Sequence, residues 1–304
     1  MRIVSLLPAA TEIVAELGAL DALAGVTHEC DWPPAARALP RVTRSGLPTS
    51  DDPAVVDAAV REQSAAGGAL FALDEATIAA LRPDAFVTQA LCDVCAVAEG
   101  DVRALAARLA TDAGGAPAVV TLGGTTLAGV FDDVRRVAAA LGRVDAGEAL
   151  VARGEARLRT IHDTLKAARA PRPRTCVVEW TDPVYLAGHW GPEMVRRAGG
   201  IDVLGTAGAH SVAVPLDALR TADPELVLVA PCGYDLPRAA AEARRLLAHP
   251  DWQWLAGRAV WALDANALLS RPGPRLVDGV EAIARIMHPG LLGEPGAATA
   301  ERVS

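Results

Sequence analysis

The stretch DAGEALVARGEARLRTIHDTLKAARA, residues 145–170, decides the fold, because no strand pattern appears anywhere within it. Its apolar residues recur three or four positions apart, the spacing of one helix face: Leu158, Ile161, Leu165 and Ala168. A helix of roughly 20–25 residues, at about 1.5 Å per residue, spans about 30–38 Å. Prolines at positions 171 and 173 end the stretch. The sequence therefore predicts one long helix that joins two halves of the protein and fixes their separation.

Short β-rich runs alternate with helical patterns on both sides of this helix, as is typical of βα units with a mostly parallel sheet. The predicted strands cover residues 2–6, 22–26, 85–88, 118–122, 175–180, 225–230 and 259–263. The predicted helices beside the long one cover residues 101–110, 127–141, 238–248 and 274–287. We therefore predict an α/β protein with an N-terminal lobe at 1–143, a connecting helix at 144–171, a C-terminal lobe at 172–290 and a disordered tail at 291–304.

The two predicted lobes contain a matching segment. LDEATIAALRPD, residues 73–84, precedes one predicted strand, and LDALRTADPE, residues 216–225, precedes another. Each is typical of a short helix, a turn with proline and an acidic residue, and a buried strand, which then enters a loop that contains cysteine. Ligands of open α/β sheets bind at the carboxyl ends of strands. The two loops therefore predict a ligand site between the lobes, and chance similarity of short α/β units is the alternative.

Composition excludes several classes of protein. The chain has 304 residues with 29 basic and 37 acidic side chains, a net charge of −8, which argues against a general nucleic-acid binder. No uncharged apolar stretch is long enough to span a membrane. Five cysteines, an odd number, do not suggest a disulfide framework. Because Arg2 leads directly into a strand pattern, we expect no signal peptide and a cytoplasmic location; a trimmed N-terminus would leave the periplasm open.

Three motifs resemble the cobalamin-binding substrate-binding proteins of ABC importers. RIVSLLPAATE at residues 2–12 resembles their opening strand and helix, CDWPP at 30–34 resembles one of their loops, and RPGPR at 271–275 resembles the turn before their last helix. The resemblance covers residues 2–289. It implies a class III periplasmic-binding-protein-like fold, in which one backbone helix joins two Rossmann-like lobes, and a corrinoid ligand. The same class also takes up haem and iron–siderophore complexes.

The chain also departs from that family. The insertion at residues 43–72 and the CDVC loop at residues 92–95 are not features of the periplasmic cobalamin carriers, and they resemble a branch without a leader sequence. Importer-coupled members present one acidic residue from each lobe to arginines of the permease. Asp217 can match the residue of the second lobe, and nothing in the first lobe matches. The pattern for docking to an ABC permease is therefore incomplete, which leaves such docking doubtful.

Aromatic side chains are the first candidate ligand contacts. Six of the chain's residues are tryptophan, a side chain with wide apolar faces and one N–H donor. Trp32 lies in the CDWPP motif, Trp180 ends a predicted strand, and Tyr185 and Trp190 follow it. A corrin is a broad, mostly apolar macrocycle with amide arms, so we predict that these four residues contact it. The alternative is that they pack within the core or between the lobes.

Histidine and cysteine supply the candidate metal ligands. His28 and His189 lie in loops of the two predicted lobes, and a neutral imidazole can ligate cobalt or iron axially. Hydrogen-bonded loop histidines are the alternative. Cys30 and Cys92 are candidate ligand contacts, and Cys92 forms a C-x-x-C pair with Cys95 ahead of a predicted helix. A structural zinc site needs four ligands, and this pair supplies two. A structural role, a ligand contact and a redox or metal role therefore all stay open for the pair.

Polar candidates lie near the last predicted strand and helix. Asn266 and Arg271 can hydrogen-bond the acetamide or propionate oxygens of a large ligand, or they can belong to the surface of the helix N-terminus. LGGTT, residues 122–126, precedes a helix and can bind an anion, but it lacks the ending of a phosphate-binding loop and is typical of a tight turn.

The sequence as a whole predicts non-catalytic, cytoplasmic binding of a cobalamin-like corrinoid in the cleft between the lobes. One alternative is an enzyme module that uses the cysteines with His28 and a metal or redox step. The other is a haem or iron–siderophore binder on the same scaffold. Nucleic acid and membrane partners are not expected.

Overall fold

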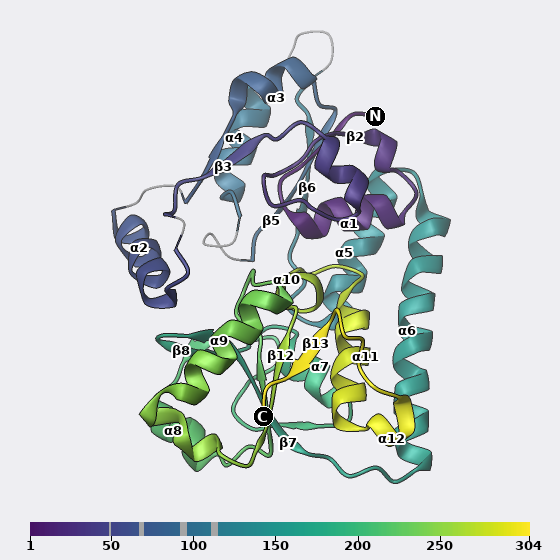
Figure 1. The fold of residues 1–304 in the computed structure, drawn as a ribbon. Helices are drawn as coiled ribbons and strands as arrows, with labels where there is room; N and C mark the ends of the chain where they lie inside the picture. The colour runs from purple at the N-terminus through teal and green to yellow at the C-terminus, as the bar shows by residue number, and fades with distance from the viewer. Residues whose placement is uncertain (49, 67–69, 92–95, 111–114) are drawn as a thin grey trace. The chain divides into compact units, whose positions relative to one another are not determined.

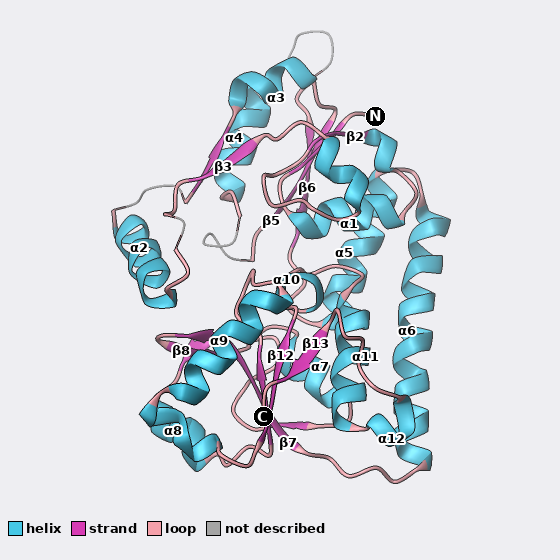
Figure 2. Cartoon of the chain, viewed as in Figure 1, coloured by secondary structure: helices cyan, strands magenta, loops and turns pink. Residues whose placement is uncertain are grey.

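A computed structural model describes residues 1–48, 50–66, 70–91, 96–110 and 115–304 (Figure 1). The chain divides into two units, which we call unit 1 (residues 1–124 and 128–152) and unit 2 (residues 125–127 and 153–304). Helices and strands alternate through both units, as Figure 2 shows, so the predicted α/β class is confirmed. Within the described ranges, no helix combines the length and the apolar character that a membrane crossing requires.

Unit 1 is built on a four-stranded parallel sheet. The strand order is β2-β1-β5-β6, with β1 at Ile3–Ser5, β2 at Leu23–Gly25, β5 at Ala85–Gln89 and β6 at Ala118–Leu122. These are the four strands that the sequence predicts for this half. Every residue of β1 and β5 is buried, because helices cover a parallel sheet on its faces.

The helices of unit 1 supply apolar side chains to this sheet. They are α1 (Pro8–Glu16), α3 (Glu75–Leu81), α4 (Glu99–Arg108) and α5 (Leu127–Ala140), with short 3-10 turns at Leu20–Ala22 and Pro34–Ala38. Helix α1 begins at a proline, which lacks only an N–H that the first turn leaves unpaired in any case. Ile78 of α3 and Leu105 of α4 pack with Phe86 of β5 in one buried cluster.

The insertion at residues 43–72 forms an antiparallel hairpin with a helix between its strands. Strand β3 (Thr43–Ser45) pairs with β4 (Phe71–Leu73), and α2 (Pro53–Ala65) lies between them in the sequence. The Asp52 carboxylate accepts a hydrogen bond from the Ala54 N–H at 3.0 Å and so caps α2. Neither the strands nor the helix of this hairpin was predicted from the sequence.

The long helix α6 covers Val144–Ala167, within three residues of the predicted stretch at each end. The two units divide inside it, between Ala152 and Arg153. Its second half is held to unit 2 by Arg157, whose guanidinium lies 2.5 Å from an Asp278 oxygen and 2.7 Å from Glu281 oxygens on α11 (Leu276–Met287). The predicted connecting helix is therefore one continuous element shared by both units.

Unit 2 is built on a seven-stranded mixed sheet. Its parallel centre consists of β7 (Arg174–Thr181), β11 (Leu226–Val229) and β12 (Ala259–Leu263), which are the three strands predicted for this half. The antiparallel strands β8 (Val184–Leu186), β10 (Val212–Ala213) and β13 (Ala300–Arg302) extend it, and β9 (Ile201–Asp202) pairs with β7. The sheet is therefore mixed: β7, β11, β12 and the short β9 pair in parallel, and β8, β10 and β13 pair antiparallel.

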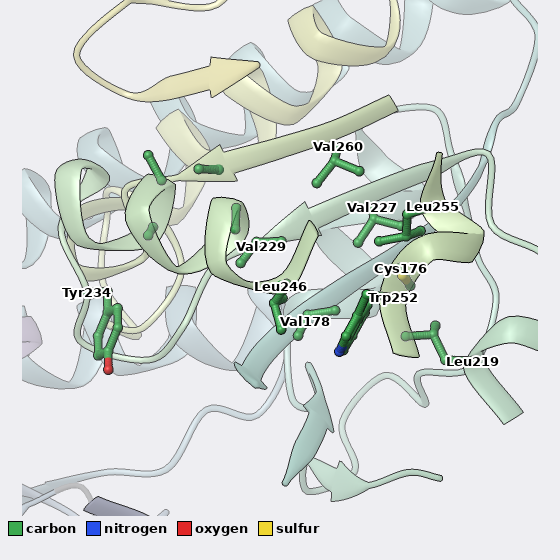
Figure 3. Close-up of a cluster of buried hydrophobic side chains, with 14 of the residues drawn as sticks. Cys176, Val178, Leu219, Val227, Val229, Tyr234, Leu246, Trp252, Leu255 and Val260 are labelled. Atoms are coloured by element: carbon green, nitrogen blue, oxygen red, sulfur yellow. The ribbon is translucent and has the colours of Figure 1, made fainter. Parts of the chain in front are cut away.

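The remaining helices of unit 2 are α7 (Gly191–Arg197), α8 (Leu216–Thr221), α9 (Leu236–Ala248), α10 (Ala265–Leu268), α12 (Pro289–Leu292) and a 3-10 turn at Pro250–Leu255. Helix α9 packs on the central strands, and Figure 3 shows its Leu246 beside Val178, Val229 and Trp252. Trp252 is 5% exposed and belongs to the same buried cluster.

The end of the chain corrects one expectation. Residues 291–304 are predicted to be disordered, yet β13 pairs antiparallel with β12 and Ala300 is buried. Arg244 of α9 also forms an ion pair with Glu301. The backbone N–H and C=O groups along the free edge of β12 are the hydrogen-bond partners that order this segment. The segment contains no apolar run from which a strand could have been predicted.

Candidate functional site

The loop after β2 in unit 1 is shaped by buried polar contacts around Cys30. The Cys30 Sγ lies 3.1 Å from the hydroxyl oxygens of both Thr11 and Thr27, and Cys30 is 1% exposed. Arg41 donates hydrogen bonds to the carbonyl oxygens of Thr27 (2.8 Å) and Cys30 (2.7 Å). The Cys30 thiol is therefore enclosed by hydroxyl groups and supports the shape of the loop, and its role as a ligand contact stays a prediction.

Trp32 lies in the same loop with a different exposure. Its side chain is 41% exposed, which is high for a large apolar residue, and a cis peptide bond joins it to Pro33. The loop follows β2, so it lies at the carboxyl edge of the unit 1 sheet, where open α/β folds bind ligands. Its role as a ligand contact stays a prediction that this exposure supports.

His28 connects the loop to the hairpin. Its Nδ1 lies 2.8 Å from the Thr43 hydroxyl oxygen of β3, and its ring centre lies 5.7 Å from that of Phe71 on β4. Burial, and then the positive charge of Arg41, lower the pKa of His28, which favours the neutral imidazole. Cys92, with Cys95, lies outside the described residues.

The turn between β6 and α5 is closed by the protein's own carboxylates. The Asp133 carboxylate, 1% exposed, accepts hydrogen bonds from the N–H groups of Gly123 (2.9 Å) and Gly124 (2.8 Å). The N–H of Leu127 donates to Glu193 at 3.0 Å. A free anion would compete with these carboxylates for the same donors, so the structure favours the tight turn over the anion site.

Aromatic side chains gather at the carboxyl edge of the unit 2 sheet. Trp180 lies near the end of β7, opposite Tyr185 of β8 in the strand register, and both are half-buried. The Trp180 ring meets the Tyr234 ring nearly edge to face, with centres 5.8 Å apart and planes at 71°. The Trp180 indole nitrogen is buried without a hydrogen-bond partner in the part of the chain that the structure describes.

Asn266 and Arg271 join this aromatic pair. The Asn266 N–H donates to the Tyr234 carbonyl oxygen at 2.9 Å, and the Arg271 guanidinium donates to the Asn266 side-chain oxygen at 2.8 Å. Arg271 is 6% exposed, which places a charged group inside the edge of the sheet. One residue near the end of β7, one from the loop after β11 and two from α10 and the loop after it are therefore linked by contacts, and we call them the unit 2 edge cluster: Trp180, Tyr234, Asn266 and Arg271.

The sequence analysis missed Tyr234 and its neighbour Arg238. The guanidinium carbon of Arg238 lies 4.0 Å from the centre of the Tyr234 ring, a cation–π contact. Asp235 caps α9 by accepting the Arg238 N–H at 3.1 Å, which fixes this first turn. An aromatic and an arginine four residues apart across a helix start would have been the available signal.

His189 lies beside this edge, in the loop between β8 and α7. Its backbone is left-handed, with φ at 48°, and its N–H donates to the Ala209 carbonyl oxygen at 2.6 Å. Its ring centre is 5.1 Å from that of His210, and its Nε2 is buried with no hydrogen-bond partner among the described residues. Burial, and then the proximity of His210, lower the pKa of His189, so the neutral ring, which can bind a metal, is favoured.

Trp190 is the most buried of the predicted aromatic contacts. Its side chain is 8% exposed, and its indole N–H donates to the Leu269 carbonyl oxygen at 2.7 Å. Trp190 therefore holds the start of α7 against the loop after α10, and its role as a ligand contact stays a prediction. Among the described residues, no group of three or more histidine, cysteine or acidic side chains is arranged to hold a metal ion.

The comparisons with known proteins place this geometry in a family. The family model described as periplasmic binding protein matches residues 3–260. The chain belongs to the periplasmic binding protein family. This periplasmic binding protein has no match among curated protein sequences. Members of the family bind solutes, and a binding protein without a catalytic step agrees with the prediction that the chain is not an enzyme.

Solved structures share the fold of this binding protein over nearly the whole chain. A periplasmic heme binding protein from Pseudomonas aeruginosa has a TM-score of 0.72 at 22% identity, covering 100% of this chain and 98% of its own. The heme-binding protein BhuT, in complex with two hemes, has a TM-score of 0.67 at 25% identity, covering 95% and 98%. The vitamin B12 binding protein BtuF of Vibrio cholerae has a TM-score of 0.63 at 20% identity, covering 94% and 96%. The class III periplasmic-binding-protein-like fold is thereby confirmed.

Proposed function

We propose that this protein binds a metal tetrapyrrole of the corrinoid type and that the unit 2 edge cluster contacts it. The observation that carries the proposal is the joining of Trp180, Tyr234, Asn266 and Arg271 at the carboxyl edge of three parallel strands. A corrin presents a wide apolar ring and amide arms. Aromatic rings suit the first, and amide and guanidinium groups suit the second.

Unit 1 supports the same proposal independently. The exposed indole of Trp32 belongs to the CDWPP motif, which resembles the corresponding loop of cobalamin-binding proteins. Cys30 and Arg41 hold this loop in place, so the indole is presented by a well-supported turn. We therefore propose Trp32 as a second ligand contact.

Haem is the second candidate, and two observations favour it. Two periplasmic heme-binding proteins share the fold at TM-scores of 0.72 and 0.67. Arginine also pairs well with carboxylates, and a neutral histidine such as His189 is a common ligand of iron. The same edge residues would then contact propionate groups in place of amides.

The test is a pair of absorbance titrations of the full chain, one with aquacobalamin and one with haemin. We expect a saturable change in the visible bands of aquacobalamin together with quenching of tryptophan fluorescence, and weaker binding of haemin. Tighter binding of haemin would assign the protein to haem. Failure of both ligands to saturate would reject the proposal.

A further inference from the structure

The hairpin of unit 1 extends beyond the carboxyl edge of its sheet. Arg41 pairs with Val26 in parallel directly after β2, so the chain from Arg41 into β3 runs in the direction of that strand. The hairpin ladder then continues to Gly46, whose N–H donates to the Leu70 carbonyl oxygen at 2.9 Å. At about 3.3 Å per residue, Gly46 lies about 16 Å beyond Arg41 along the strand. Helix α2 therefore lies past the edge that carries the Trp32 loop, as the path of β3 in Figure 1 indicates.

Helix α2 has an apolar side that its own unit buries only in part. Of its 13 residues, all of them described, Pro53 alone is buried. Val55 is 47% exposed, while Val56, Ala59 and Val60 are half-buried. These four residues lie one helical turn apart in pairs and form a continuous apolar stripe. A helix in a globular protein normally buries such a stripe against its core, and this one is covered only in part, with Val55 the most exposed of the four.

The hairpin that carries α2 is fixed to the candidate ligand loop. His28 contacts both strands, through the Thr43 hydroxyl of β3 at 2.8 Å and the Phe71 ring of β4 at 5.7 Å. Its backbone N–H also donates to the Thr43 hydroxyl oxygen at 3.1 Å. His28 lies four positions before Trp32 in the same segment. The residue that contacts the hairpin therefore also belongs to the segment that presents the exposed indole.

We propose that α2 is a ligand-contacting element, whose stripe of Val55, Val56, Ala59 and Val60 covers an apolar face of the bound metal tetrapyrrole. The inference rests on the proposed function and assigns a role to the insertion that sets this chain apart from the cobalamin carriers it resembles. The stripe is uncharged and lies past the carboxyl edge of the unit 1 sheet, the edge that carries the Trp32 loop. Its apolar surface therefore suits the broad apolar ring of a macrocycle. The only ion pair inside α2 in the described structure, Asp57 with Arg61 at 2.8 Å, lies outside the stripe.

The first test introduces charge into the stripe with the double variant Val56→Asp, Val60→Asp. Titrations with aquacobalamin and with haemin should show affinity lowered by about tenfold or more for whichever macrocycle the unchanged protein binds, because carboxylates replace apolar contacts. Thermal unfolding should stay close to that of the unchanged protein, since α2 is not part of the core. Val144→Asp, at an exposed valine of α6 outside the hairpin, is the control and should bind normally.

Two outcomes would overturn the inference. If the double variant binds within about twofold of the unchanged protein, α2 does not contact the macrocycle, while the proposed function stands. If sedimentation shows that the double variant abolishes a dimer and leaves macrocycle affinity unchanged, the stripe covers a second copy of the chain. If the unchanged protein binds neither macrocycle, the proposed function fails and this inference fails with it.

Limited trypsin digestion gives a readout that does not depend on the variants. Arg61 in α2 is 61% exposed as a side chain and offers a cleavage site next to Val60. A saturating macrocycle should slow cleavage at Arg61 by about fivefold or more if it covers α2. Equal cleavage rates with and without bound macrocycle would contradict the inference.

Discussion

The two units are built alike at the amino edges of their sheets and differently at the carboxyl edges. The N–H of Arg2 donates to Asp84 at 2.6 Å in unit 1, and the N–H of Arg174 donates to Glu225 at 2.7 Å in unit 2. Each arginine also donates through Nε to a carbonyl oxygen of the turn that leads into the neighbouring strand, β5 in unit 1 and β11 in unit 2. In both units that turn contains a left-handed residue beside a proline. The matching segments predicted from the sequence are therefore matching structures.

The carboxyl edges show what distinguishes the units. Unit 1 adds the β3–β4 hairpin with α2 and a loop held by Cys30 and Arg41, whereas unit 2 adds β8 and β10 and presents the edge cluster. The shared amino edge builds a scaffold, and the loops at the other edge carry the specific chemistry. This division is what a binding protein needs, because the ligand surface can change while the scaffold stays the same.

The largest effect on stability should come from replacing Asp133, which holds the turn between β6 and α5. Asp133→Ala removes a buried carboxylate and leaves the N–H groups of Gly123 and Gly124 without an acceptor. We expect the free energy of unfolding to fall by about 3 kcal/mol, measured by urea denaturation. Asp132→Ala, at the exposed neighbouring position, is the control and should cost less than about 0.5 kcal/mol. Equal losses in the two variants would show that the turn does not depend on Asp133.

A second prediction compares the aromatic contacts of the two edges. Trp32→Ala in unit 1 and Trp180→Ala in unit 2 should each weaken macrocycle binding by about tenfold, because each removes one apolar ring face. Trp180→Phe keeps a ring and should recover part of the loss. If only one of the two alanine variants affects the affinity measured by titration, the ligand contacts are confined to that unit.

Acid should lower the free energy of unfolding through buried histidines, two of them in unit 2 and one in unit 1. Burial lowers the pKa of His189 and His288 in unit 2 and of His28 in unit 1 below the ordinary value of 6.5. The folded protein then binds fewer protons than the unfolded chain as pH falls through 6.5 toward the folded pKa values, so the free energy of unfolding decreases over that range.

The measurement is urea denaturation at about pH 7.5 and about pH 5.5. A His189→Gln, His288→Gln variant should lose less unfolding free energy between the two pH values than the unchanged protein does. His28→Gln should also lose less than the unchanged protein, but by a smaller margin than the double variant. A pH dependence that is identical in all three proteins would contradict the assignment to these buried rings.

The smallest effects test the likeness of the amino edges. Arg2→Ala and Arg174→Ala each remove the exposed side-chain hydrogen bond from Nε, leave the backbone N–H in place and should cost about 0.5–1 kcal/mol of unfolding free energy. The loss for Arg174→Ala should be equal or slightly larger, because its guanidinium also donates to the Ala222 carbonyl oxygen. A loss in one unit more than about 1 kcal/mol above the other would show that the matching segments support their sheets to different degrees.

Much of the fold could be predicted because its signals are local. The apolar spacing of Leu158, Ile161 and Leu165 and the prolines after them placed α6 within three residues, and short β-rich runs placed all seven central strands. The strands β3, β4, β8, β9, β10 and β13 were missed because they are short and largely exposed or half-buried, whereas the equally short β1 and β2 carry buried apolar residues. Such strands depend on the backbone groups of a neighbour and carry no periodic pattern of their own.

The sequence by itself determined the α/β class, the backbone helix and the place of Trp32 in the CDWPP motif. Only the tertiary structure decided which candidates meet: it joined Trp180 and Tyr234 to Asn266 and Arg271, enclosed Cys30 between two threonine hydroxyls and buried Trp190 under a hydrogen bond to Leu269. Spacing along a chain reports which face of one element a residue occupies. Burial and hydrogen-bond partners depend on segments that are distant in sequence, so the identity of a site residue becomes known only when those segments are brought together.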